Sequence, residues 1–129
     1  MKLTHFFFPA LLCACFVAPG EEQQAPLACN LKAFSHEERI AWRNLIEEVK
    51  QAETPTGELA NGHVFRIDTG RISIAKVAGW IDLERKCCPF LNFQLSLEGA
   101  TGAMTLALTG GRGVKEFIAE DFRPWFRKP

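Results

Sequence analysis

Two alternating segments, FQLSLE at Phe93–Glu98 and MTLALT at Met104–Thr109, decide the fold expected for this chain. In both, apolar and polar residues alternate, which is typical of β-strands with one buried face. The connection Gly99–Ala103 is short and contains two glycines, so the two segments are predicted to pair as an antiparallel hairpin. The sheet of this protein is therefore expected to be rich in antiparallel strand pairs.

A long amphipathic helix is predicted upstream, from His36 to Ala52. Ser35 and Glu38 have the spacing of a capping box, in which each side chain accepts a hydrogen bond from the other residue's backbone. Apolar residues then recur at helical spacing: Ile40, Ala41, Leu45, Val49 and Ala52. The following segment, Glu53–Gly62, carries Thr-Pro-Thr-Gly and Asn-Gly turn signals and is predicted to be a connection.

One more strand and two more helices complete the pattern. His63–Asp68 alternates as a strand, and a helix is predicted from about Ile72 or Ser73 to Cys87, where Pro89 limits its extension. Its expected buried stripe comprises Ile74, Val77, Ala78 and Ile81. A third helix is predicted over Val114–Phe122. The chain is thus expected to be α+β in the order α-β-α-β-β-α, with three helices on one face of a small, antiparallel-rich, three-stranded sheet.

The first twenty residues have the layout of a secretory signal peptide. Met1–His5 is short and positive, Phe6–Ala18 is apolar but too short to span a bilayer, and small residues follow. LCAC at residues 12–15 also resembles a lipoprotein box, so a lipid anchor at Cys15 is an alternative. The predicted divisions are a signal peptide at 1–20, a linker and N-terminal segment at 21–34, one domain at 35–122 and a tail at 123–129. The protein is expected to be exported, to the periplasm or beyond.

The charge balance argues against a nucleic-acid partner. The chain has 129 residues, of which 15 are basic and 15 are acidic, so it presents no overall field that would attract phosphate.

The run LERKCCPF at Leu83–Phe90 concentrates the reactive chemistry of the chain. Helical spacing places Glu84 beside Cys87 or Cys88. Removal of the leader would leave Cys29 as the third thiol. Thiolates select soft ions such as Cu(I), Zn(II), Hg(II) and As(III). The candidate metal ligands are therefore Cys87, Cys88, Cys29 and Glu84. Three thiolates suit As(III) or Hg(II), and a fourth ligand for zinc could be Glu84, His36 or His63.

Two alternatives remain open from the residues. Cys29 could form a disulfide with Cys87 or Cys88 and staple a structural or protein-interaction domain. A thiol enzyme is the other alternative, although the C-terminal end of a helix opposes thiolate formation and the chain has no Cys-x-x-Cys pair.

From Ala28 to Phe122 the chain resembles a group of small uncharacterised bacterial proteins. The resemblance is carried by ACNL at residues 28–31, WIDLERKCCPF at residues 80–90 and TGGRGVKEF at residues 109–117. Related Cys-Cys-Pro-Phe segments look similar to extensions on some regulators of the mercury-resistance class, which implies heavy-metal handling. Many members lack an export leader, so residues 1–20 argue against a cytoplasmic metal-sensor role. The resulting hypothesis is an exported small domain that binds a thiophilic metal or metalloid through adjacent cysteines.

Overall fold

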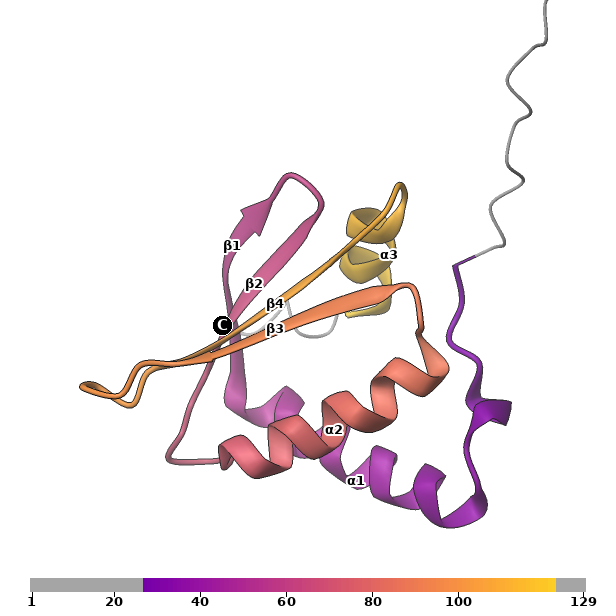
Figure 1. The fold of residues 1–129 in the computed structure, drawn as a ribbon, viewed down its shortest axis with the longest axis horizontal. Helices are drawn as coiled ribbons and strands as arrows, with labels where there is room; N and C mark the ends of the chain where they lie inside the picture. Colours follow the sequence, from indigo (N-terminus) through magenta and orange to yellow (C-terminus); the bar gives the residue numbers. More distant parts are fainter. Residues whose placement is uncertain (1–26, 123–129) are drawn as a thin grey trace, which may run out of the picture.

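The sheet contains four antiparallel strands in the spatial order β1-β2-β4-β3 (Figure 1). The computed structural model describes residues 27–122. The strands are β1 (Glu53–Leu59), β2 (Gly62–Ile67), β3 (Leu91–Leu97) and β4 (Met104–Gly110). The helices are α1 (His36–Ala52), α2 (Ile74–Cys87) and α3 (Val114–Asp121), and a short 3₁₀ turn, η1 (Leu31–Ala33), precedes α1. The α+β class and the β3–β4 hairpin are confirmed.

The prediction of a three-stranded sheet is wrong, because Glu53–Leu59 is a strand instead of a connection. The order is therefore α-β-β-α-β-β-α. β1 follows α1 directly and pairs with β2, and a β-bulge lies between Pro55 and Gly57. Proline is tolerated on an edge strand, where its missing N–H breaks no ladder. The proline, the bulge and the largely exposed side chains conceal the strand pattern in the sequence.

One face of the sheet carries the core. Phe65 of β2 is opposite Leu106 of β4, which is opposite Leu95 of β3, so these side chains share a face. The helices cover this face: Trp80 of α2 contacts Phe93 edge-on at 6.0 Å, and His63 Nε2 lies 3.2 Å from a backbone carbonyl of α3. The opposite face of β4 stays half-buried.

α1 begins at the predicted capping box and packs beside α2. Ser35 Oγ accepts from the Glu38 N–H at 3.1 Å, and Glu38 Oε2 accepts from the Ser35 N–H at 3.0 Å. Two ion pairs join the helices, from Lys76 to Glu48 and from Lys86 to Glu38. Both pairs are at the surface, so they orient the helices more than they stabilise them.

The predicted apolar stripes are only partly right. In α1 the side chain of Ile40 is 48% exposed, whereas Ile46 is buried. In α2 the side chain of Ile74 is 43% exposed, and the buried residues are Val77, Trp80, Glu84 and Cys87. α2 is rotated so that its largest side chain, Trp80, faces the sheet. This rotation carries Glu84 and Cys87 into the interior.

No helix between residues 27 and 122 has the length and apolar character that crossing a membrane requires. The predicted leader at 1–20, the lipid anchor at Cys15 and the tail at 123–129 lie outside the described residues.

The close approach of β2 to β4 depends on Gly62. A Cβ atom at this position would overlap the carbonyl oxygen of Leu108, which is part of the β4 backbone and has little room to move. We expect Gly62→Ala to lower the free energy of unfolding by about 3 kcal/mol, measured by urea denaturation. Gly57→Ala is the matched control in β1, since its Cβ would meet nothing within 4 Å. Equal urea midpoints for the two variants would contradict this account.

Candidate metal centre

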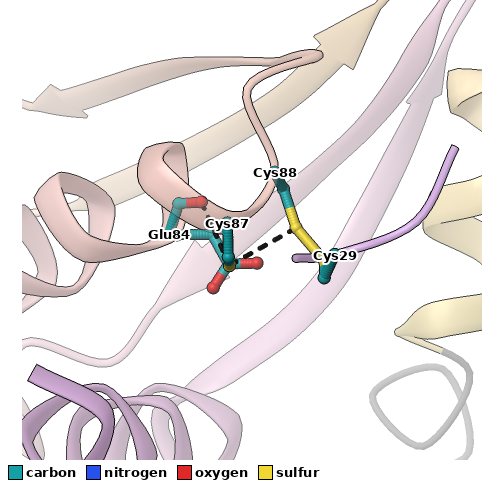
Figure 2. A group of neighbouring side chains, drawn as sticks. All are labelled: Cys29, Glu84, Cys87 and Cys88. Carbon is teal, nitrogen blue, oxygen red and sulfur yellow. Dashed lines mark hydrogen bonds between the residues drawn. A yellow bond between two sulfur atoms is a disulfide. The ribbon is translucent and has the colours of Figure 1, made fainter. Parts of the chain in front are cut away.

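The structure brings together the four residues singled out from the sequence. The ligand atoms of Cys29, Glu84, Cys87 and Cys88 all lie within 4.8 Å of one another. Figure 2 shows the cysteine side chains of two separate segments gathered beside Glu84. Glu84 and Cys87 belong to α2, Cys88 is its C-cap, and Cys29 lies in the N-terminal segment that precedes η1.

The end of α2 sets the directions of the adjacent cysteines. Glu84 and Cys87 are three residues apart and therefore share the buried side of the helix. Cys88 leaves helical geometry, and its N–H donates to the Glu84 carbonyl at 2.8 Å. The Leu91 N–H then donates to the Cys88 carbonyl at 3.1 Å, which turns the chain into β3. Cys87 thus points into the core while Cys88 meets the N-terminal segment.

A disulfide joins Cys29 to Cys88, whose Cα atoms are 4.8 Å apart. This pairing selects one of the two possibilities that the sequence leaves open. The Asn30 N–H also donates to the Cys87 carbonyl at 2.8 Å. That carbonyl is at the end of a helix and has no partner within the helix, so Asn30 supplies its hydrogen bond. The N-terminal segment is therefore held to α2 by its backbone as well as by the disulfide.

Cys87 is a free, fully buried thiol. Its Sγ lies 3.6 Å from Cys88 Sγ and donates to the Glu84 carbonyl at 3.3 Å. Burial raises the pKa of the Cys87 thiol to about 12, and the negative charge of Glu84 adds to the effect. Cys87 is accordingly protonated at neutral pH.

Glu84 is a buried carboxyl, only 1% exposed. Burial raises its pKa, and the charge of Asp121 contributes in the same direction. The Trp42 indole N–H donates to Glu84 Oε2 at 2.5 Å and opposes the rise, because the hydrogen bond favours the carboxylate. The carboxyl is thus oriented by a residue of α1.

A pocket of about 430 Å³ opens beside the cluster. Cys29 and Glu84 contribute to its wall, and the remaining lining comes from the N-terminal segment, from α1 and from α3 with its C-cap. Asp121 also lines the pocket, and burial raises the pKa of this carboxyl while Lys50 opposes the shift. The lining residues are Leu27, Ala28, Cys29, Leu31, Trp42, Ile46, Lys50, Glu84, Phe117, Asp121 and Phe122.

The two histidines considered as fourth ligands are not part of this group. His36 is exposed at the start of α1, and His63 is buried in β2 beside α3. Trp42 was not predicted to be part of the site, although it stands three, four and seven residues before other inward-facing positions of α1. That spacing was a usable signal. No local sequence signal marked Asp121, because its position beside the pocket depends on how α3 packs.

The Cys87 thiol should resist alkylation in the folded protein. With a pKa of about 12, only about one thiol in ten thousand is ionised at pH 8. We expect iodoacetamide to label Cys87 at least a hundredfold more slowly in native protein than in urea, measured by mass spectrometry with the disulfide intact. Labelling at equal rates in both conditions would contradict the described burial.

Glu84 should make folding depend on pH in a defined direction. Its folded pKa is raised, so its contribution to stability is complete below the unfolded pKa and is lost as pH rises through the folded pKa. As pH rises from 4 to 8, we expect the free energy of unfolding of wild type to fall relative to that of Glu84→Gln, measured by urea denaturation. The control is Glu116→Gln, which removes an exposed carboxyl of α3. A constant difference between Glu84→Gln and wild type across this range would contradict the assignment.

Comparisons of the chain with protein-family models, with curated proteins and with solved structures give no match. The function of the site is therefore inferred from the chemistry of its own residues.

Proposed function

We propose that the reduced protein binds a thiophilic metal or metalloid ion through Cys29, Cys87 and Cys88, with Glu84 as a fourth donor. The observation that carries this proposal is the convergence of three sulfurs and one carboxylate within 4.8 Å. These atoms come from two chain segments, and Cys29 and Glu84 line the pocket beside them, whereas Cys87 and Cys88 are fully buried.

The spacing of the sulfurs suits a shared ion after modest rearrangement. Two thiolates bound tetrahedrally to one zinc ion lie about 3.8 Å apart, given Zn–S bonds of about 2.3 Å. The sulfurs of Cys87 and Cys88 are already 3.6 Å apart. Reduction would let the sulfurs of Cys29 and Cys88 separate by side-chain rotation. The hydrogen bond from Asn30 to Cys87 supports continued docking of the segment that carries Cys29.

The donor set favours soft ions. Three thiolates suit trigonal As(III) or Hg(II), and the Glu84 carboxylate would complete a four-coordinate site for Zn(II). Coordination displaces the thiol proton, so a buried, neutral cysteine is no obstacle to binding. It is, however, a poor nucleophile, which disfavours the thiol-enzyme alternative.

A second candidate function is that of a stapled structural domain, and the Cys29–Cys88 disulfide specifically favours it. The cysteines are 59 residues apart, and closing a loop of this length contributes about 4 kcal/mol in the chain-entropy model. The two functions belong to different redox states. The oxidised chain is stapled, and the reduced chain offers three thiols.

The proposal extends to the cellular location. The leader expected at residues 1–20 would place the protein outside the cytoplasm, where disulfides persist, so metal binding there requires that the Cys29–Cys88 disulfide is first reduced. The resemblance to Cys-Cys-Pro-Phe proteins supports a part in heavy-metal handling.

Metal binding is tested on the full chain with Cys13→Ser and Cys15→Ser, so that three thiols remain. The protein is reduced with a trialkylphosphine and titrated separately with Hg(II), As(III), Zn(II) and Cu(I). We expect one ion per folded chain by native mass spectrometry for at least one of these ions. We expect Cys87→Ser/Cys88→Ser to weaken its binding at least a hundredfold.

Circular dichroism of the reduced protein decides between the two candidates. A folded reduced chain that loses binding in the double variant supports the metal site. Equal uptake by the double variant would refute it. Unfolding on reduction, with ions bound only by unfolded chains, would leave the stapled domain as the function.

A further inference from the structure

The pocket beside the sulfurs is much larger than a bare ion needs. A metal ion is enclosed by ligand atoms about 2 to 2.5 Å away, whereas this pocket has a volume of about 430 Å³. That size lies within the range of roughly 300 to 1,000 Å³ found for sites that bind small organic molecules.

The lining of the pocket is mostly apolar and aromatic. Trp42 comes from α1, Phe117 from α3, and Phe122 from the C-cap of α3. The Phe117 ring is held edge-on against Phe90 at 4.9 Å, so this wall is preorganised. Aromatic side chains favour an aromatic guest in offset or edge-on contact.

Of the three cysteines in the cluster, only Cys29 is among the residues that line the pocket. Its disulfide partner Cys88 is buried behind it, as is the free thiol of Cys87. A ligand entering from the pocket would therefore meet Cys29 first and Cys88 next. Consider one atom bonded to both of these sulfurs in place of the disulfide bond. A third group bonded to that atom would point toward the pocket.

We infer that the site takes monosubstituted trivalent arsenicals, R–As(III), in which arsenic bridges Cys29 and Cys88 and an aryl group R occupies the pocket. This inference rests on the proposed function, since it requires the same reduced thiols. It differs in leaving Cys87 outside the coordination, because trivalent arsenic with one carbon substituent accepts only two thiolates.

The chemistry balances without a redox change at arsenic. A phosphine or a cellular dithiol first supplies two electrons, and two protons are taken up, to open the disulfide. R–As(OH)₂ then reacts with the two thiols. Two S–H and two As–O bonds break, two As–S bonds form, and two water molecules leave.

Phenylarsine oxide and its methyl counterpart test the inference, because they offer arsenic the same two bonds and differ in the hydrocarbon group. Each is titrated into the reduced full chain carrying Cys13→Ser and Cys15→Ser, in competition with a small dithiol. We expect the protein to prefer phenyl over methyl by about tenfold more than the small dithiol does, since the larger group buries more apolar surface.

Ala28→Phe narrows the pocket from an exposed position of its lining, where folding should be little disturbed. We expect it to reduce phenyl binding about tenfold and methyl binding much less. Ala100→Phe is the matched control, at an exposed position in the turn between β3 and β4. It should change neither. Cys87→Ala should keep phenylarsenical binding and weaken that of inorganic As(III).

The outcomes separate this inference from the proposed function. Binding of both arsenicals without an added phenyl preference, or equal loss of both in Ala28→Phe, refutes the inference and leaves the metal site standing. Loss of phenylarsenical binding in Cys87→Ala refutes the bridging arrangement. Failure of the reduced chain to bind inorganic ions and arsenicals alike refutes both.

Discussion

The inward-facing side of α2 is the constraint on which the site depends. This helix must bury Trp80 against the sheet, and the same rotation takes Glu84 and Cys87 out of solvent. A carboxyl in the interior is costly unless it is hydrogen-bonded or neutral. Trp42 of α1 donates the hydrogen bond to Glu84. Burial raises the pKa of the Glu84 carboxyl and so favours its neutral form. Packing therefore creates the unusual chemistry at the end of α2.

The buried side chains of the cluster are neutral when protonated, and the same side chains bind cations well once they lose their protons. Burial favours the protonated forms of Cys87 and Glu84, and the charge of Lys50 opposes this effect at Glu84 without reversing it. A soft ion would supply that positive charge and take the place of the protons. The disulfide between Cys29 and Cys88 meets the same demand in another way, since it removes two ionisable thiols. In the oxidised state the disulfide, and in the reduced state protonation or a bound ion, would keep unpaired negative charge out of the interior.

Local signals in the sequence predicted those helices and strands whose ends are marked by nearby residues. The capping box at Ser35 fixed the start of α1, and alternation fixed the β3–β4 hairpin. β1 was missed because Pro55 and the adjacent bulge interrupt its pattern. At the site, helical spacing was enough to place Glu84 beside Cys87. The contact with Cys29 could not be derived, since it joins segments 59 residues apart and depends on how the chain enters α1. The pocket depends likewise on the packing of α3, which no local pattern encodes.

The β-bulge in β1 affects which edge of the sheet can pair with a strand from another molecule. A sheet with open edges can recruit an extended segment of another chain through main-chain hydrogen bonds. At the β1 edge, Pro55 lacks an N–H and the bulge disturbs the regular ladder. The opposite edge strand, β3, pairs with β4 in a regular register and contains no proline, so it is the edge that presents fewer obstacles to an added strand. β3 begins at Leu91, shortly after Cys88, so a neighbour that extended the sheet there would also lie close to the end of the chain segment that carries the Cys29–Cys88 disulfide.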